Sequence, residues 1–203
     1  MKHIIIDYGL GNLRSIEKAL QYVGSDVEIS TDPSAIDNAD ALILPGVGAF
    51  RDAMMHFATL ARVVEDAVND GKPLLGICLG MQMLASESEE GGMYRGIDII
   101  PGRVVRFPAS ELKVPHMGWN SLIIRKDIPL LDGIKNGSFV YFVHSYYVET
   151  VEKHQAALCD YGLKFPSVIM NEAGNVFGTQ FHPEKSGTIG LKMLKNFVES
   201  YGH

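Results

Sequence analysis

The first half of the chain alternates short apolar runs with stretches whose apolar residues recur at helical spacing. Three runs, at residues 3–7, 27–30 and 41–44, are compact and are typical of strands buried in a parallel sheet. A helix is predicted between the first two runs, and Gly24 ends it. The apolar positions of this helix are Leu13, Ile16, Leu20 and Val23.

A second helical pattern follows the third run and leads to a fourth strand. It predicts one helix over residues 54–68, before an apolar run at residues 74–77. Good helix formers then continue from Leu79 to Ala85. We therefore expect a mostly parallel sheet flanked by helices.

The pattern changes after Ile97 to short apolar runs interrupted by prolines and glycines, which is typical of antiparallel strands. The strongest strand signal covers residues 139–144, and three more strands are predicted at 156–159, 167–170 and 176–181. The predicted fold class is α/β, with a doubly wound, mostly parallel central sheet flanked by helices and antiparallel strands added in the second half. A C-terminal helix is predicted to pack on the sheet through Leu194, Phe197, Val198 and Tyr201.

Length and composition predict a single domain over residues 1–203. A chain of 203 residues with 46% hydrophobic content can form one sizeable core but hardly two. Its formal net charge of -6 argues against a nucleic-acid or membrane surface and favours a small molecule or a protein as partner. No segment has the pattern of a signal peptide or a membrane span. Cys78 and Cys159 are the only cysteines, so no disulfide is expected and a cytoplasmic location is predicted.

Cys78 lies between a predicted strand and a predicted helix, in the pattern G-x-C-x-G. Gly76 and Gly80 flank it, and a sharp turn needs residues without a Cβ atom at such positions. The unpaired N–H groups and the positive end of a helix stabilise a thiolate at this place. The spacing predicts a cysteine nucleophile, although most lone cysteines are small buried hydrophobes.

Two further segments carry candidate chemistry in loops. Gly46, Val47 and Gly48 follow a parallel strand, where their N–H groups could face a reacting oxyanion, but an ordinary strand-to-helix connection would also explain these glycines. The acidic run at residues 86–92 is predicted to be a flexible surface loop. It could also place one carboxylate beside the ammonium group of a ligand.

His182 and Glu184 are predicted to touch. Pro183 favours an extended conformation for His182, and in extended chain residues i and i+2 point to the same side. A histidine oriented by a carboxylate activates a neighbouring cysteine for acyl transfer, so this pair is expected to meet Cys78. The alternative is a His–Glu pair that only caps the last helix.

Six motifs resemble a known family and extend from the first predicted strand to the last helix. GICLGMQ around Cys78, FHPEKS from Phe181 and PGVGAF from Pro45 together resemble the triad-type glutamine amidotransferases, which are doubly wound α/β proteins. The remaining three narrow the resemblance to the glutaminase subunits of imidazole glycerol phosphate synthases. They are DYGLGNLRS at 7–15, PHMGWN at 115–120 and YFVHSYY at 141–147.

The resemblance implies that glutamine is hydrolysed through a cysteinyl thioester, without metal or cofactor. It makes Cys78 the nucleophile, His182 the proton shuttle and Glu184 the group that orients His182. The oxyanion hole would be formed by Gly46, Val47, Gly48 and the amide of Leu79. Glutamine would be held by Gln82, Glu90, His144, Ser145 and Tyr146.

The resemblance also implies a heterodimer with a (β/α)8 cyclase subunit. This partner would use the ammonia to make imidazole glycerol phosphate and an aminoimidazole carboxamide ribotide in histidine biosynthesis. Ammonia is mostly protonated in water, so it must be delivered dry, which requires a protein interface at the mouth of the site. Trp119, the only tryptophan, suits an interface, although without the family match it would be assigned to the core. The predicted interface residues are Asn12, Met117, Trp119, Asn120, Tyr141 and Lys185.

Three alternatives remain open for the sequence. Amidotransferase subunits of the anthranilate, guanylate or pyridoxal phosphate pathways would share the triad but should lack DYGLGNLRS and PHMGWN. A non-catalytic binding module on the same fold should have lost the nucleophile. A hydrolase of γ-glutamyl peptides would need no second chain for its reaction, and the fold alone decides between none of these.

Overall fold

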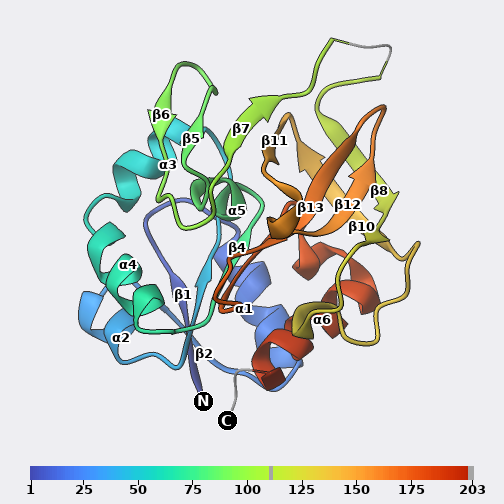
Figure 1. Cartoon of the computed structure of the whole chain (residues 1–203). Helices are drawn as coiled ribbons and strands as arrows, with labels where there is room; N and C mark the ends of the chain where they lie inside the picture. Colours follow the sequence, from blue (N-terminus) through green and yellow to red (C-terminus); the bar gives the residue numbers. More distant parts are fainter. Residues whose placement is uncertain (110–111, 201–203) are drawn as a thin grey trace.

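An eight-stranded sheet forms the centre of the protein in a computed structural model, which describes residues 1–109 and 112–200 (Figure 1). The strand order is β2-β1-β3-β4-β14-β13-β12-β9. Neighbouring strands from β2 to β14 are parallel, whereas β13, β12 and β9 add antiparallel pairs, as predicted for the second half. The bounds are β1 Lys2–Ile6, β2 Asp26–Ser30, β3 Ala41–Leu44, β4 Leu74–Ile77, β9 Ile123–Ile124, β12 Gln155–Asp160, β13 Lys164–Met170 and β14 Val176–Thr179.

Helices cover both faces of this sheet (Figure 1). Side chains of α1 and α6 belong to one apolar cluster, and those of α2, α3, α4 and α5 belong to another. Strand β1 is buried between them because Ile5 contributes to the first cluster while Ile4 and Ile6 contribute to the second. The helices are α1 Leu13–Tyr22, α2 Pro33–Asp37, α3 Phe50–Phe57, α4 Ala61–Asn69, α5 Leu79–Met83 and α6 Gly187–Ser200.

Two helix predictions differ from the structure. The single helix expected over residues 54–68 is wrong, because the chain turns after Phe57, where the N–H of Leu60 bonds the Phe57 carbonyl, and starts again as α4. A break this short keeps the same face buried, so apolar periodicity does not reveal it. The short helix α2 was not predicted, although Asp32 caps it by accepting from the N–H of Ser34 and a proline occupies its first turn.

Two smaller sheets complete the fold, one antiparallel and one mixed. Strands β8 His116–Ser121 and β10 Phe139–His144 form a ribbon, and β10 has the bounds predicted from the sequence. The other sheet has the order β11-β7-β5-β6, with β11 Tyr146–Glu149, β7 Arg103–Arg106, β5 Glu87–Ser88 and β6 Tyr94–Arg95.

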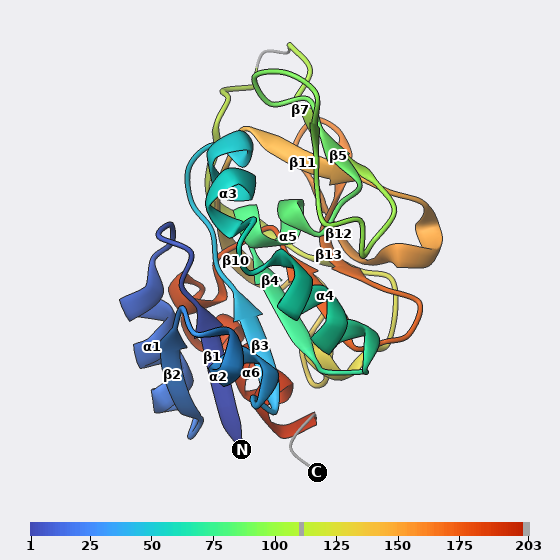
Figure 2. The ribbon, with the colours of Figure 1, turned by 90° about the vertical axis from the view of Figure 1, so that its left-hand side faces the viewer.

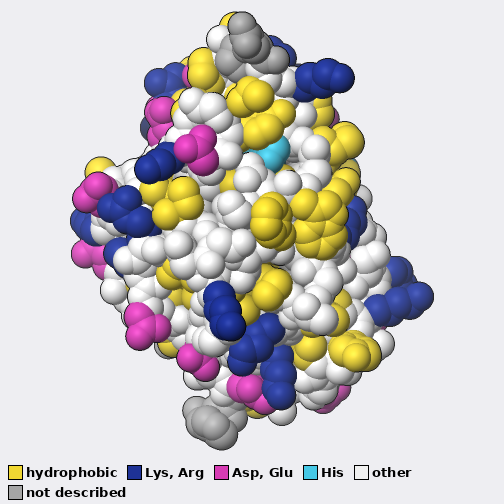
Figure 3. Space-filling view, turned by 90° about the vertical axis from the view of Figure 1, so that its right-hand side faces the viewer, with side chains coloured by type: hydrophobic (Ala, Val, Ile, Leu, Met, Phe, Trp, Pro, Cys, Tyr) yellow, Lys and Arg dark blue, Asp and Glu magenta, His cyan; other side chains and the backbone are white. Residues whose placement is uncertain are grey.

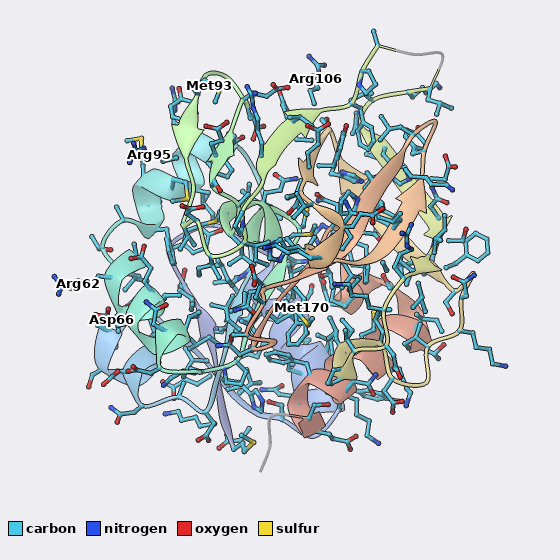
Figure 4. The ribbon with its side chains drawn as sticks, in the orientation of Figure 1. Arg62, Asp66, Met93, Arg95, Arg106 and Met170 are labelled. Atoms are coloured by element: carbon cyan, nitrogen blue, oxygen red, sulfur yellow. The ribbon has the colours of Figure 1, made fainter. Side chains whose placement is uncertain are left out.

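The acidic run at residues 86–92 is only in part the surface loop predicted for it, since residues 89–92 lie outside any strand. Its residues 87–88 form β5, which pairs with both β6 and β7, and Ser88 is buried. Backbone pairing on both sides explains this order, which charge composition does not indicate. Arg95 of β6, Met93 in the preceding turn and Arg106 of β7 extend outward from this sheet (Figure 4).

The C-terminal helix packs on the sheet as predicted. Leu194 and Phe197 are fully buried, and Val198 is partly buried against the same cluster. The fourth residue of the predicted apolar face, Tyr201, lies outside the described residues. Among the described helices, none has the length and apolar character needed to cross a membrane.

The carboxyl ends of the parallel strands gather the candidate site. In Figure 2, β1, β3 and β4 run side by side with these ends towards α3 and α5. Strand β14 lies next to β4, with Thr179 paired to Ile77, so the segments that follow both strands meet at one edge. Ligands bind at such an edge in open α/β sheets.

Candidate active site

Cys78 occupies a strained turn between β4 and α5. Its φ is 56° and its ψ is -108°, a region that residues with a Cβ atom rarely adopt. The N–H of Cys78 donates to the carbonyl of Thr179 at 2.7 Å, which ties the turn to β14. A Cβ atom on Gly80 would lie 1.9 Å from the Leu44 carbonyl oxygen, and one on Gly76 would lie 2.8 Å from that of Gly80. The glycines of G-x-C-x-G are therefore required by close backbone approach.

His182 and Glu184 form a buried pair beside this turn. His182 Nδ1 and Glu184 Oε1 are 2.9 Å apart, and both side chains are almost completely buried. His182 is extended as predicted, but Pro183–Lys185 form the 3₁₀ helix η3. The predicted contact is thus present, whereas the extended path predicted for it is wrong, because a tight turn brings residue 184 back to 182.

The environment of His182 favours its protonated form. Burial alone would lower the pKa of His182, but hydrogen bonds with Cys78 and Glu184 and the charges of both groups outweigh it and raise the pKa to about 9. An imidazolium beside the sulfur is thus the favoured form at neutral pH. This group can give a proton to a leaving amine and then act as a base.

Backbone contacts hold His182 against β10. The N–H of His182 donates to the Tyr141 carbonyl at 3.0 Å, and Ser186 Oγ donates to the His182 carbonyl at 2.6 Å. The same hydroxyl accepts from the N–H of Tyr141 at 3.0 Å. Ser186 was not predicted as a site residue, although it is the last residue of FHPEKS.

A cavity of about 310 Å³ opens in front of Cys78 and His182. It collects all five predicted glutamine-binding residues and three of the four predicted oxyanion residues, but not Gly46. Pro115 and Val143 also line it and were not predicted. The predicted residues on its wall are Val47, Gly48, Cys78, Leu79, Gln82, Glu90, His144, Ser145, Tyr146 and His182.

Gly46 is packed behind the cavity wall and differs from Gly48. A Cβ atom on Gly46 would lie 2.7 Å from Tyr8 Oη and 2.8 Å from the backbone nitrogen of Gly80, so this position is crowded. Tyr8 also donates to the Pro45 carbonyl at 2.7 Å, and burial raises the pKa of its hydroxyl, as does the charge of Cys78. Gly48 has a φ of +101° with open space around it. The segment is therefore crowded at Gly46 and open at Gly48.

Gln82 and Glu90 are anchored at the wall of the cavity. Gln82 Nε2 donates to the Tyr146 carbonyl at 3.0 Å and to Gln180 Oε1 at 3.1 Å. Glu90 Oε2 accepts from the N–H of Phe50, the first residue of α3, at 2.8 Å. Gln180 was not predicted, yet it is fully buried and its Nε2 is 3.8 Å from Cys78 Sγ. Its place just before FHPEKS was the only signal.

Exposed apolar residues gather on the β8–β10 ribbon (Figure 3). Met117 is 62% exposed and Trp119 is 55% exposed, so a core assignment for the tryptophan is wrong. Trp119 pairs with Tyr141 across the ribbon, and their ring centroids are 6.0 Å apart. Phe139 is 58% exposed on the same ribbon and was not predicted. We call Met117, Trp119, Phe139 and Tyr141 the ribbon patch.

The other predicted interface residues lie near the ribbon patch or apart from it. Asn120 is half-buried on β8, and Lys185 is exposed in η3, next to β10. Asn12 directly precedes α1, and this helix contacts η3. The Asn12 residue itself lines a separate surface groove, together with Asp7 and Glu17. In the described part of the chain, no group of three or more His, Cys, Asp or Glu residues could hold a metal ion.

Comparison with known proteins gives consistent matches over nearly the whole chain. Residues 4–200 match the family described as glutamine amidotransferase class-I. The chain is 61% identical over 196 residues to imidazole glycerol phosphate synthase subunit HisH of Methanosarcina acetivorans, a match that covers 97% of both chains. It is 54% identical over 202 residues to the protein of the same name from Halobacterium salinarum, covering 97% of this chain and 92% of the relative.

Solved structures share the fold at lower identity. PurLQS from Thermotoga maritima superposes with a TM-score of 0.76 at 20% identity, covering 100% of this chain and 99% of the other. A glutamine amidotransferase from the same organism gives a TM-score of 0.66 at 17% identity, covering 100% and 82%. These likenesses establish the α/β fold and do not distinguish between pathways.

Proposed function

The chain belongs to the class-I glutamine amidotransferase family, and on that premise we propose how its residues perform the reaction. It is the glutaminase subunit of imidazole glycerol phosphate synthase, in histidine biosynthesis. The anthranilate, guanylate and pyridoxal phosphate pathways are therefore not those of this chain, and it is an enzyme rather than a non-catalytic module.

Hydrolysis begins with attack of Cys78 Sγ on the carboxamide carbon of glutamine. A C–S bond forms, the C–N bond breaks, and a proton from His182 goes to the nitrogen, which leaves as ammonia. Water then attacks the thioester while His182 accepts its proton. The C–S bond breaks, glutamate leaves, and the sulfur and imidazolium return to their initial state. The raised pKa of His182 and its contact with Glu184 support this assignment.

Backbone N–H groups of Val47, Gly48 and Leu79 stabilise the oxyanion in this scheme, whereas Gly46 lies behind the cavity wall and is left out of it. Leu79 is the first residue of α5, where backbone N–H groups lack a partner within the helix. Val47 and Gly48 line the cavity beside Cys78, which supports their role. Preorganised donors of this kind act where charge develops in the transition state.

The glutamine main chain is held by other polar groups of the cavity wall. Glu90 is the one carboxylate on that wall within the described residues, so it is assigned to the substrate ammonium group. Gln82, His144, Ser145 and Tyr146 are assigned to the remaining polar groups of the substrate. Their common position on the cavity wall supports this assignment.

The ribbon patch and its neighbours dock a (β/α)8 cyclase subunit. The exposed rings of Trp119 and Phe139 support an interface, because aromatic side chains are enriched in the cores of interfaces. The backbone of Tyr141 holds His182, so this face lies directly beside the catalytic pair. Asn12, Asn120 and Lys185 complete the proposed contact. Ammonia would then pass to the cyclase without meeting water, for synthesis of imidazole glycerol phosphate and aminoimidazole carboxamide ribotide.

The strained turn that presents Cys78 beside the His182–Glu184 pair is the observation that carries this mechanism. Its test is the rate of glutamine hydrolysis in the complex with the cyclase subunit. Cys78→Ala should abolish activity without changing the thermal unfolding temperature by more than a few degrees, because a methyl group fits the turn. Cys159→Ala, in β12 away from the cavity, is the matched control and should retain activity. Near-normal hydrolysis by Cys78→Ala would overturn the mechanism.

A further inference from the structure

A chain of hydrogen bonds connects the ribbon to the glutamine cavity. Asn120 Nδ2 lies 3.3 Å from His116 Nε2, and His116 Nδ1 lies 3.0 Å from His144 Nε2. His144 Nδ1 lies 2.8 Å from the carbonyl oxygen of Tyr146, which also accepts from Gln82 Nε2. His144 and Tyr146 line the cavity, whereas His116 does not.

The direction of every hydrogen bond in this series follows from the groups at its two ends, the Tyr146 carbonyl and the Asn120 amide. The Tyr146 carbonyl can only accept, so His144 carries its proton on Nδ1 and presents Nε2 as an acceptor. His116 must then donate from Nδ1 and accept at Nε2. At the other end, Asn120 Oδ1 accepts from the N–H of Ser121 at 2.8 Å, which leaves Nδ2 as the donor to His116.

Both histidines are held neutral in an aromatic environment. Burial lowers the pKa of His116 to about 4 and that of His144 to about 3. For His144, the hydrogen bond to the Tyr146 carbonyl opposes this decrease, whereas the charges of His116 and His182 add to it. The ring of His116 stacks between Phe142 and Tyr161, with centroid distances of 4.7 and 4.0 Å. Each neutral imidazole ring has one donor nitrogen and one acceptor nitrogen. No other arrangement of protons would therefore satisfy every partner in this series of hydrogen bonds.

We propose that His116 is a positioning residue for glutamine, which fixes the Nδ1–H tautomer of His144 and thereby the Tyr146 carbonyl at the cavity wall. This inference rests on the proposed glutaminase function, since it assigns that wall to the substrate. With its carbonyl held by two side-chain donors, Tyr146 keeps one peptide orientation. The fixed Tyr146–Tyr147 peptide then holds the Tyr146 backbone in one position at the cavity wall before the substrate binds, which reduces the ordering needed on binding.

The first test uses the protein without any reaction. Nitrogen-15 NMR of the full chain distinguishes protonated from unprotonated imidazole nitrogens. The wild type should show Nδ1–H and bare Nε2 at both His116 and His144 between pH 6 and 8. An Nε2–H tautomer or an imidazolium at either residue would overturn the proposal, whatever the enzymatic activity. A wild-type chain that has the tautomers but does not hydrolyse glutamine in the complex with the cyclase subunit would instead contradict the proposed function.

The second test is kinetic, in the complex with the cyclase subunit. His116→Phe keeps an aromatic ring for stacking but cannot donate to His144, and a lost buried hydrogen bond of this kind should raise KM for glutamine about tenfold while kcat changes less than about threefold. His116→Asn can place an amide donor near the lost Nδ1–H and should restore KM to within about threefold. Tyr161→Phe is the control, because its hydroxyl donates to the Lys113 carbonyl and not to His116.

Two results would contradict the positioning role. One is an unchanged KM in His116→Phe, and the other is a fall in kcat as large as the rise in KM. If His116→Phe does not fold, His116→Asn decides the question. That variant should then combine a nearly normal KM with an Nδ1–H tautomer of His144, and loss of both would also contradict the proposal.

Discussion

At the scale of single residues, Cys78 combines a costly backbone conformation with a chemical role. A non-glycine residue at positive φ costs roughly 1–3 kcal/mol and persists only where the surroundings determine it. Here the Thr179 carbonyl holds its N–H, and Gly76 and Gly80 allow the chains around it to approach closely. The result is a thiol at the wall of the cavity, within reach of His182.

Glu184→Gln should reduce glutamine hydrolysis less than Cys78→Ala does. The amide keeps a hydrogen-bonding group for His182 Nδ1 but removes the charge that stabilises an imidazolium. His182→Ala combined with Cys78→Ala should be no slower than either single variant, because the two residues act as one unit. Steady-state glutaminase rates of the complex test both statements. A Glu184→Gln variant as inactive as Cys78→Ala would give Glu184 a role beyond orientation.

Glu184→Gln should also change the pH dependence of the free energy of unfolding. The folded-state pKa of His182 is raised to about 9, so its contribution to stability is complete below the ordinary pKa of 6.5 and is lost as the pH rises to about 9. Glu184→Gln removes one cause of that increase, and the loss should therefore end at a lower pH. Urea unfolding at pH values from 6 to 9.5 measures it, and identical profiles for both proteins would contradict the assigned cause.

At the scale of elements, residues 45–49 join a crowded end to an open one. Gly46 is enclosed by Tyr8 and the start of α5, whereas Gly48 adopts positive φ in open space. The N–H groups of this segment are the proposed oxyanion donors, so its conformation controls their direction. A conformational change at Gly48 would meet fewer neighbouring atoms than one at Gly46.

Gly48→Val should lower glutamine hydrolysis in the cyclase complex by up to about 10²-fold, the effect of losing one oxyanion donor. A β-branched side chain is strained at φ +101°, so the segment would settle in another conformation. We expect weaker hydrolysis by the free chain, in which an N–H of this segment points away from the oxyanion, and Gly48→Val should change that weaker activity little. Gly137→Val, also at positive φ in open space but outside the cavity lining, is the control for strain alone. Equal rates for Gly48→Val and wild type in the complex would contradict the role of this segment.

At the scale of the whole molecule, two apolar clusters share the strands of one sheet. Isoleucine side chains of β1 alternate between the two clusters. Loss of packing in one cluster would therefore also destabilise the strand on which the other cluster packs. We therefore propose that residues 1–203 form one domain. Thermal unfolding should be a single transition in which the calorimetric and van't Hoff enthalpies agree. Two separated transitions would contradict a single domain.

Much of the fold and part of the candidate site could be predicted from local patterns in the chain. Buried parallel strands are short and apolar, so β3 and β4 were predicted with the bounds that the structure has, as was the antiparallel strand β10. G-x-C-x-G indicated a sharp turn because close backbone contacts exclude a Cβ atom at Gly76 and Gly80. Local spacing carries such information because the constraint acts within a few residues.

Only the tertiary structure decided what depends on distant segments. Three contacts join residues whose neighbours in sequence do not reveal them. They are Gln180 with Cys78, Ser186 with His182 and Tyr141, and His116 with His144. The break between α3 and α4 leaves the buried face unchanged, so periodicity could not detect it. The sequence around Trp119 also could not show that its side chain is exposed. An apolar side chain on a strand is buried or exposed according to what packs on that face of the strand.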